Sequence, residues 1–393
     1  MTAKGSTLTT IITWLIPFGL CPMSRSKSGM VLSTFPAAGD GARSQRGEIM
    51  SESEIGIDPL TLPFDQYQRY TAAAQVAAGL RDYLGRPRLT VLDVGGFFRT
   101  RRGKDIRPAA LFLPADRVFA VDLAVASLPC YALARGEALP FGRRAFDLVI
   151  ACDTLEHVPP ARRPAFVDEL LRVASHAVLL IAPFDSPATR LAERVVYEYL
   201  IAQGYQQVQL KEHLDNGLPQ VQDLRALLTE RGLPFLDFAD GYLPHWLLMM
   251  LIKHTPGQSL DFHLDLDRYY NLTLSPGDRR EPAYRRGFVI VRPEHQALLT
   301  DLTVRLRPAA SPPDPTAWGF LTGLFSLLNQ GQMAATVRAQ HETARQQAEM
   351  QERLAALQAE NARLREQIAA YEQGRFIRSM RRLAAWRARL GLP

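Results

Sequence analysis

The chain has 393 residues, with 46 Lys and Arg, 40 Asp and Glu, and 47% hydrophobic residues. This size allows one large α/β domain with extensions, or two domains. Residues 374–393 hold six arginines and no acids, so the remaining chain balances 40 basic against 40 acidic residues. A neutral remainder argues against a broad nucleic-acid-binding face, and we expect no nucleic-acid partner. The three cysteines form no C-x-x-C pair, which argues against a structural zinc site and a disulfide framework and favours the cytoplasm.

The first segment, residues 1–49, is rich in Ser, Gly and Ala and is predicted to be disordered. Its most apolar run, Leu8–Leu20, contains Pro17 and is shorter than the roughly 18–20 residues that a membrane span needs. A secretion signal is the alternative interpretation of this run. Translation starting at Met50 is a further hypothesis.

From residue 64 the chain alternates predicted helices and apolar strands. Helices are predicted at 64–83 and 162–174, and strands at 89–96, 117–122, 146–152 and 177–182. Because these strands are almost continuously apolar, they indicate a parallel sheet covered on both faces, in an α/β fold. Residues 99–114 predict an irregular first crossover.

After Pro183 the pattern is looser. Helices are predicted at 191–203 and 221–231, strands at 235–238 and 286–291, and either state at 246–252. The four prolines of residues 307–315 predict an extended linker, which we place at 307–316.

The C-terminal part is predicted to be helical. Within 317–373, residues 347–371 carry a heptad pattern with Asn361 at one a position, which favours a two-stranded homodimer. A helix packed on its own domain is the alternative. Residues 375–390 place apolar side chains on one face and arginines on the other, which is typical of a helix on an anionic membrane surface. A partner-binding helix is the alternative for this tail at 374–393.

Residue types suited to a nucleoside cofactor follow the first two strands. Gly95 and Gly96 follow Asp93 and allow a sharp turn close to a ligand, and Asp122 ends the second strand, where a carboxylate can accept both ribose hydroxyls. Ligands of open parallel sheets bind at these carboxyl ends. The alternatives are an ordinary strand-ending turn and a solvated acid.

The most specific phrase is GEALPFGRRAFDLVIACDTLEHV, residues 136–158. It resembles the type 11 group of class I S-adenosylmethionine-dependent methyltransferases. The resemblance covers residues 88–185 and implies a Rossmann-like, doubly wound, mostly parallel seven-stranded sheet. It implies a methyltransferase domain at 50–306, with a cofactor half at 88–185 and a substrate half at 186–306. The usual run D-x-G-x-G-x-G departs here at Phe97 and Arg99.

The resemblance also implies which residues bind S-adenosyl-L-methionine. In addition to the residues above, these are Leu123, Glu137, Ala138 and Asp153. Glu137 and Ala138 belong to the segment that lines the adenine in the family, where Arg135 replaces a frequent acid. Asp153 ends the strand beside the methionine half of the cofactor.

A catalytic base is expected just beyond that strand. His157 is the leading candidate because an imidazole titrates near neutral pH, with Asp153 and Glu156 orienting the substrate or the cofactor amine. His157 shaping the loop is the alternative, and His213 and His245 are further candidates. No metal site is predicted.

The acceptor pocket is expected within residues 190–300. Its proposed lining is aromatic and polar, although the same residues suit an ordinary core: Tyr242, His245, Trp246, Tyr269, Tyr270 and Asn271. The order of domain, coiled coil and basic tail resembles that of enzymes modifying lipid-linked bacterial polysaccharides. We therefore expect O-methylation of a cell-surface polysaccharide or other glycan by a cytoplasmic protein at the inner face of the membrane. A small metabolite or lipid precursor as acceptor, and a non-catalytic dimeric scaffold, are the alternatives.

Overall fold

The computed structural model describes residue 54 and residues 56–391. The predictions for residues 1–49, including the apolar run at 8–20, lie outside these residues. The chain divides into two compact units, the first ending at Phe325 and the second comprising Ser326–Pro393.

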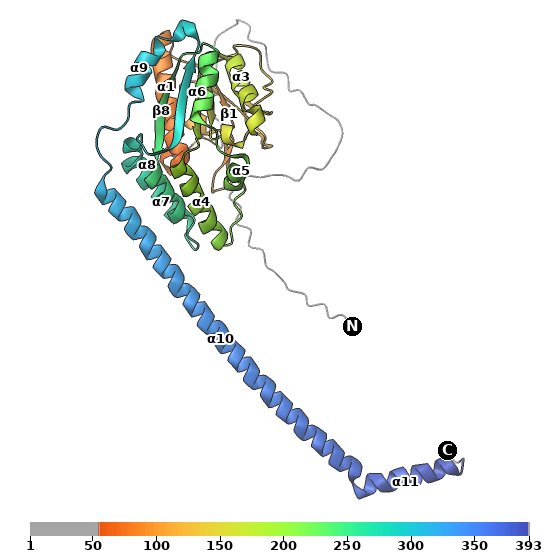
Figure 1. Ribbon diagram of the computed structural model, residues 1–393. Coiled ribbons are helices and arrows are strands. Elements are labelled where there is room, and N and C mark those ends of the chain that lie inside the picture. Colours follow the sequence, from red (N-terminus) through yellow and green to blue (C-terminus); the bar gives the residue numbers. More distant parts are fainter. Residues whose placement is uncertain (1–53, 55, 392–393) are drawn as a thin grey trace. The chain divides into compact units, whose positions relative to one another are not determined.

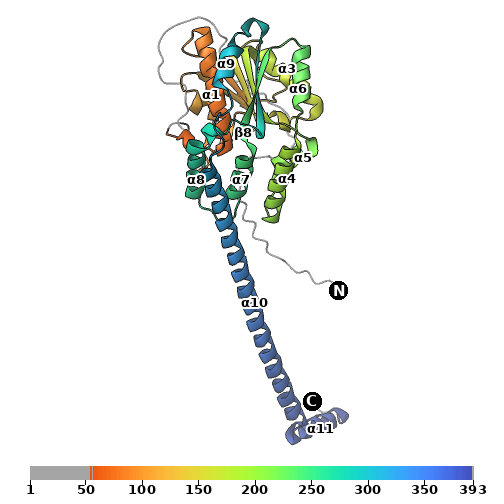
Figure 2. The same ribbon diagram turned by 60° about the vertical axis from the view of Figure 1, so that its left-hand side comes forward.

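The first unit contains a seven-stranded sheet, which is visible in Figures 1 and 2. In spatial order the strands are β5 (Tyr131–Leu133), β4 (Arg117–Asp122), β1 (Thr90–Val94), β6 (Phe146–Cys152), β7 (Ala174–Pro183), β9 (Ala283–Val291) and β8 (Phe235–Tyr242). All neighbouring pairs are parallel except the two that β9 makes with β7 and β8. The predicted doubly wound, mostly parallel sheet is therefore confirmed.

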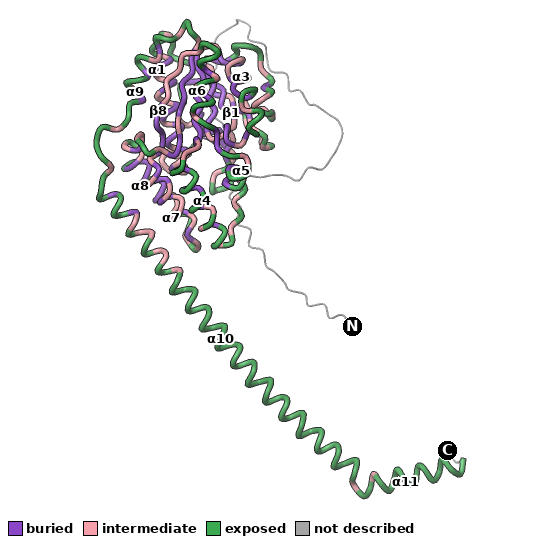
Figure 3. The backbone as a smooth tube through the Cα atoms, viewed as in Figure 1, coloured by how far each residue is buried: buried purple, intermediate pink, exposed green. Residues whose placement is uncertain are grey.

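Helices cover both faces of this sheet. Successive residues of each strand point to opposite faces, and here the residues on both faces are apolar. On one face Val91 packs with α1 (Phe64–Leu84), α2 (Pro108–Phe112) and α9 (Leu298–Arg305). On the other face Leu92 packs with α3 (Arg163–Val173) and α6 (Val221–Glu230). Figure 3 shows the strands as the most continuously buried part of the chain.

Four further helices lie toward the carboxyl ends of the parallel strands (Figure 1). They are α4 (Pro187–Ala202), α5 (Val208–Asn216), α7 (Leu243–Lys253) and α8 (Leu260–Thr273). The segment 246–252, for which the sequence left both states open, belongs to helix α7. Single-turn 3-10 helices occupy Pro59–Thr61 (η1), Leu155–His157 (η2), Pro160–Arg162 (η3), Ser275–Gly277 (η4) and Pro293–His295 (η5).

Three of the aromatic and polar residues proposed for the acceptor pocket are core residues instead. Trp246 stacks on Tyr284 with ring centroids 3.7 Å apart. Tyr270 is fully buried and donates to Asp278, and Asn271 donates to the Leu60 and Leu62 carbonyls. All three are buried and contact other core residues, although Asn271 Oδ1 has no hydrogen-bond partner, so the packing interpretation is correct for them.

The first crossover is irregular, as residues 99–114 predict. A two-stranded antiparallel hairpin, β2 (Phe98–Arg99) with β3 (Asp105–Ile106), precedes the short helix α2. Arg99, which stands where the family has a glycine, forms a bidentate ion pair with Asp105 across the hairpin. The departure from the family pattern therefore marks the start of an inserted hairpin.

Two helices form the C-terminal part, α10 (Pro315–Gln373) and α11 (Arg375–Arg389). No regular element occupies residues 307–314. The first turns of α10 belong to the first unit, where Ala317 and Leu321 are buried. The apolar residues at the heptad a and d positions between Leu354 and Tyr371 are all exposed in the single chain. Among the helices of residues 56–391, none is long and apolar enough to cross a membrane.

Candidate functional site at the carboxyl ends of the strands

The turn after β1 requires its two glycines. Gly95 has φ +81°, and a Cβ there would lie 2.4 Å from Thr154 Oγ1. A Cβ on Gly96 would lie 2.6 Å from the Asp93 carboxylate. A left-handed conformation and close contacts exclude larger residues at Gly95. The sharp turn that the sequence predicts is therefore present, and Thr154, just beyond the end of β6, is the residue that crowds it.

Asp93 lies beneath this turn and is fully buried. Its Oδ2 accepts a hydrogen bond of 2.8 Å from the Tyr70 hydroxyl, whereas the buried Oδ1 has no partner in the structure. Burial, only partly offset by this hydrogen bond, raises the pKa of the Asp93 carboxyl to about 7. The Asp93 side chain therefore packs against Gly96 of the turn and is held there by the Tyr70 hydroxyl.

Asp122 lies at the end of β4, next to β1. Its carboxylate accepts hydrogen bonds from the amides of Phe97, at 3.2 Å, and of Leu123 and Ala124, at 2.6 and 3.1 Å. Burial raises the pKa of this carboxyl. These bonds connect the turn after β1 to the end of β4, and the carboxylate retains acceptor capacity for further donors.

The remaining residues that the resemblance assigns to the cofactor differ in exposure. Leu123 is 67% exposed, and Ala138 is also exposed. Glu137 is half-buried and lies 3.8 Å from an Arg162 nitrogen in an ion pair. Leu123 directly follows β4, and Glu137 and Ala138 lie in the loop between β5 and β6.

Asp153 follows β6 in a left-handed conformation, with φ 49°. Arg285 at the start of β9 contacts both of its carboxylate oxygens at 2.7 Å, and Arg69 of α1 forms a second ion pair with it. Burial raises the pKa of the Asp153 carboxyl, but the two arginines outweigh burial and lower it to about 2. A carboxylate held in this way orients the loop and is poorly suited to exchanging a proton, which argues against a catalytic role for Asp153.

Beyond Asp153, the helical turn η2 presents Glu156 and His157. Glu156 is 1% exposed, and its Oε2 has no hydrogen-bond partner in the structure. Burial, followed by the charge of Asp153, raises the pKa of the Glu156 carboxyl to about 8. His157 Nδ1 lies 2.9 Å from a carboxylate oxygen of Glu212 on α5. Burial and the nearby His213 lower the pKa of the His157 imidazole.

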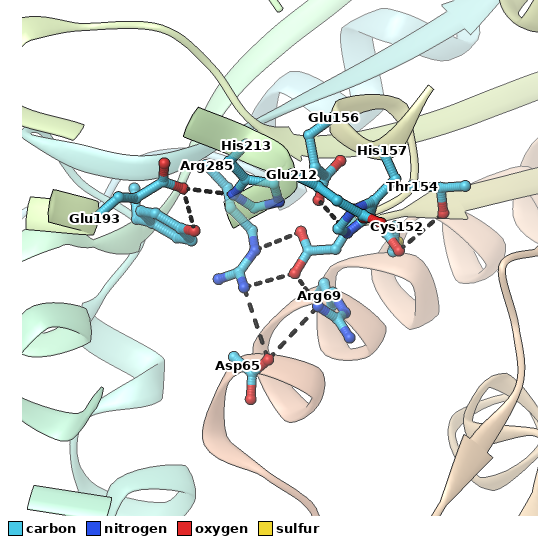
Figure 4. Close-up of polar contacts among 12 residues, drawn as sticks. Asp65, Arg69, Cys152, Thr154, Glu156, His157, Glu193, Glu212, His213 and Arg285 are labelled. Atoms are coloured by element: carbon cyan, nitrogen blue, oxygen red, sulfur yellow. Dashed lines mark hydrogen bonds and ion pairs between the residues drawn. The ribbon is translucent and has the colours of Figure 1, made fainter. Parts of the chain in front are cut away.

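His213 of α5 lies against His157, with ring centroids 4.9 Å apart (Figure 4). Its Nδ1 is 2.8 Å from Glu193 Oε1 on α4, which also accepts from the Tyr284 hydroxyl. The buried Nε2 of His213 has no partner. Burial lowers the pKa of this imidazole, but the carboxylates of Glu193 and Glu156 outweigh burial and raise it.

Glu156, His157 and His213 therefore converge on one point. One ligand atom from each lies within 4.8 Å of the other two, an arrangement that can hold a metal ion. The prediction of no metal site did not foresee this cluster. His213 was one of three histidine candidates, and the fold brings it to His157. His245 is instead buried against Asp278, with Nδ1 2.7 Å from Asp278 Oδ1.

An open cavity of about 420 Å³ lies between the end of β7, α4, α6 and the start of β9, and none of the three cluster residues lines it. Tyr284 and Arg285, which bind Glu193 and Asp153, are part of its wall. Polar and apolar atoms share its surface about equally, but most of its lining residues carry polar or charged side chains, among them Asp185, Ser186, Gln222, Arg225, Glu281 and Arg286. Part of this lining comes from residues 190–300, where the acceptor pocket was expected, but it includes none of the residues proposed for that pocket and extends back to residue 184.

Sequence reasoning missed the residues that hold this loop in place. Arg69, Arg285, Glu193 and Glu212 come from four different elements. One signal was present for Arg285, because a charged residue at the start of an otherwise apolar strand requires a partner. The remaining three are unremarkable residues of helical segments.

The residues at the end of β1 and β4 fit S-adenosyl-L-methionine. The Gly95 and Gly96 turn provides a backbone that a ligand can approach closely, and Asp122 offers carboxylate oxygens at the neighbouring strand end. In the spatial order β4, β1, β6, the chain order reverses next to β1, which is where such folds bind nucleoside ligands.

Residues 102–182 match the family described as "Methyltransferase domain". The match includes the whole phrase at 136–158 and most of residues 88–185, and it confirms the resemblance. No curated protein matches the chain.

The chain is also similar to solved structures. Magnesium protoporphyrin IX methyltransferase from Synechocystis with bound SAH is 17% identical, covering 58% of this chain and 84% of that chain, with a TM-score of 0.33. The YcgJ protein from Bacillus subtilis is 15% identical, covering 56% and 97%, with a TM-score of 0.32. The plantazolicin methyltransferase in complex with a triazolic analogue and SAH is 10% identical, covering 59% and 86%, with a TM-score of 0.36. None of these likenesses identifies the acceptor of this chain.

Proposed function

We propose that this S-adenosylmethionine-dependent methyltransferase methylates a hydroxyl oxygen of a cell-surface polysaccharide or other glycan. The observation that carries the proposal is the open cavity beside the end of β7, most of whose lining residues are polar or charged. Its charged and amide side chains suit an acceptor rich in hydroxyl groups, which offers a donor and acceptors at each oxygen. An apolar lipid precursor would instead require an apolar wall.

The cofactor-binding residues that we propose are those of the first two strand ends. Asp122 would accept hydrogen bonds from the ribose hydroxyls, while the turn at Gly95 and Gly96 lets the backbone approach the ligand. Glu137 and Ala138 would border the adenine, as in the family. When bound, S-adenosylmethionine supplies an activated methyl group whose bond to sulfur breaks with the electron pair remaining on sulfur.

The acceptor hydroxyl must lose its proton as its oxygen bonds to the methyl carbon. His157 and His213 do not line the cavity, but His213 binds Glu193, which also accepts from the wall residue Tyr284. Each histidine has Nδ1 bound to a carboxylate, so Nε2 is the ring nitrogen left to accept a proton. The lowered pKa of His157 keeps its imidazole neutral near pH 7. The base proposed from the sequence could therefore act only through Nε2.

Label transfer tests the proposal. The full chain is incubated with methyl-labelled S-adenosylmethionine and, separately, with the glycan and the extractable lipid fractions of its source cells. We expect the label in the glycan fraction, in a form that resists mild base, because ethers survive base and methyl esters do not. Label in the lipid fraction alone, or base-labile label, would contradict a glycan hydroxyl as acceptor.

The tail supports a membrane-associated setting for this acceptor. Helix α11 exposes Phe376, Met380 and Trp386 and carries six arginines. Such a helix binds anionic lipid through apolar burial and charge. In vesicle sedimentation, we expect a variant with Arg378, Arg381 and Arg382 changed to Ser to lose binding to anionic vesicles. The matched variant with Arg338, Arg345 and Arg353 of α10 changed to Ser should still bind, and equal binding by both variants would refute the membrane role of α11.

The exposed heptad positions of α10 support a homodimer. Leu357 and Leu364 occupy d positions and are more than half exposed in the single chain. Pairing with a second copy would bury them. Analytical ultracentrifugation should give a dimer for the full chain and a monomer for a variant with both residues changed to Lys. A monomeric full chain at micromolar concentration would contradict this proposal.

A further inference from the structure

We propose that Glu156, His157 and His213 form a binding site for one divalent first-row transition metal ion, such as Zn²⁺ or Mn²⁺. The ligand atoms are one Glu156 carboxylate oxygen and the Nε2 atoms of the two histidines. They come from the turn η2 after β6 and from helix α5, which contact each other. The site lies beside Asp153 at the end of β6.

The orientation of the two imidazoles is the first argument. The Nδ1 of each histidine is hydrogen-bonded to a carboxylate. His157 Nδ1 lies 2.9 Å from Glu212, and His213 Nδ1 lies 2.8 Å from Glu193. The carboxylate accepts a hydrogen bond from Nδ1–H, and in this neutral tautomer each Nε2 keeps its lone pair. Histidines that bind metals almost always have such a carboxylate or carbonyl behind them, because it fixes the ring and its tautomer. Two backed histidines facing one point are therefore an arrangement suited to a metal.

The unpaired buried atoms are the second argument. His213 Nε2 and Glu156 Oε2 both lack a hydrogen-bond partner, although His213 is 7% exposed and Glu156 is 1% exposed. Buried polar atoms without partners are costly, so two of them in one cluster indicate a missing ligand. His157 Nε2 lies 4.0 Å from Glu156 Oε1, and all three groups reach a common centre.

The local charge is the third argument. Three carboxylates surround the point, Glu156, Glu193 and Glu212, and within the described part of the chain their ion pairs run to the two histidines. The arginines nearby, Arg285 and Arg69, are bound to Asp153. A bound cation would compensate the charge of these carboxylates in place of the protons that metal ligands must release. Figure 4 shows the three carboxylates around the two imidazoles.

The donor set selects the class of ion. Two imidazole nitrogens and one carboxylate oxygen suit Zn²⁺, Mn²⁺, Fe²⁺ and Co²⁺, whereas Mg²⁺ and Ca²⁺ prefer oxygen ligands. Three protein ligands leave positions open for other molecules. A role for the ion next to the acceptor rests on the proposed function: its charge would lower the pKa of a nearby acceptor hydroxyl, and the proton would leave to solvent. His157 would then be a ligand and could not also act as the base.

Cobalt binding tests the site directly. The full chain is freed of metal with a chelator and titrated with Co²⁺, whose visible absorption reports protein nitrogen ligands, and Zn²⁺ is then added in competition. We expect one Co²⁺ per chain and displacement by Zn²⁺. In the variants E156Q and H213Q the Co²⁺ affinity should fall at least about tenfold.

The matched control is H245Q. His245 is equally buried and also gives Nδ1 to a carboxylate, that of Asp278, but it lies outside the cluster. Its loss should leave Co²⁺ affinity unchanged, and circular dichroism establishes that each variant is folded. E156Q keeps the shape of the side chain, so it remains informative if H213Q does not fold. Absence of stoichiometric Co²⁺ binding, or equal affinity in E156Q and the unmodified chain, would overturn the proposal.

Calorimetry with S-adenosylmethionine on the same samples separates this inference from the proposed function. Cofactor binding without Co²⁺ binding would overturn the metal site alone. Co²⁺ binding without cofactor binding would overturn the methyltransferase function alone and leave the metal site standing.

Discussion

Two neighbouring regions at the carboxyl ends of the parallel strands are built in different ways. At the ends of β1 and β4, backbone amides and buried carboxyls close to one another in the sequence make the site, with Gly95, Gly96 and Asp122 at its centre. At the end of β6, side chains from α1, α4, α5 and β9 converge on Asp153, Glu156 and His157. The first arrangement tolerates little change of backbone, whereas the second depends on matched charges. Substitutions in the two regions should therefore fail for different reasons.

The largest expected effect is in the charged region. Replacing Arg285 with Met removes the bidentate partner of Asp153 and leaves a largely buried carboxylate with Arg69 alone. We expect the free energy of unfolding in urea to fall by about 3 kcal/mol, as for broken buried ion pairs. The neighbouring R286M is the control, because its close partner Glu281 is 61% exposed and its second partner Asp237 is 3.6 Å away and also paired with Arg225, so its loss should cost less than about 1 kcal/mol. Equal losses in both variants would contradict the difference between the two regions.

Asp93 predicts a pH dependence for the backbone-built region. Its pKa is raised to about 7 in the folded protein, so folding takes up a proton between about pH 4 and pH 7. The stability contributed by the protonated carboxyl is complete below about pH 4 and is lost as pH rises through 7. In D93N this loss is absent.

Urea unfolding of D93N and the unmodified chain at pH 5 and pH 8 measures this difference. Between these pH values the unfolding free energy of D93N should rise relative to the unmodified chain by about 1–4 kcal/mol. A difference independent of pH would show that Asp93 is charged in the folded protein.

The turn itself gives the smallest effect on stability but a specific effect on the cofactor. G95A forces a side chain into a left-handed conformation and toward Thr154. We expect the unfolding free energy to fall by about 1–2 kcal/mol and the rise in Tm on adding S-adenosylmethionine to disappear. In G142A, where a Cβ would meet nothing within 4 Å, the rise should remain. A full cofactor-induced rise in G95A would show that the turn does not contact the ligand.

The same contrast explains what the sequence could predict. Strands β4 and β6 begin and end where their apolar runs do, and Asp93, Gly95 and Asp122 follow from local patterns. Helix α7 remained ambiguous because a short apolar run suits either a helix or a strand. The pairing of His157 with His213, 56 positions apart, and of Asp153 with Arg285 depends on how α5 and β9 pack, which no local pattern encodes. Trp246 and Tyr270 were assigned to a pocket but belong to the core, because aromatic residues suit both environments and their sequence does not distinguish them.

Calorimetric titration of S-adenosylmethionine tests the central claim, that the carboxyl ends of β1 and β4 bind this cofactor. The full chain and D122N are compared, because Asn keeps an oxygen for the Phe97 amide and removes the charge. We predict one cofactor per unmodified chain and an affinity at least about tenfold lower in D122N, since hydrogen bonds to charged groups contribute about 1.5–3 kcal/mol. No binding by the unmodified chain, or equal affinity in D122N, would contradict the claim.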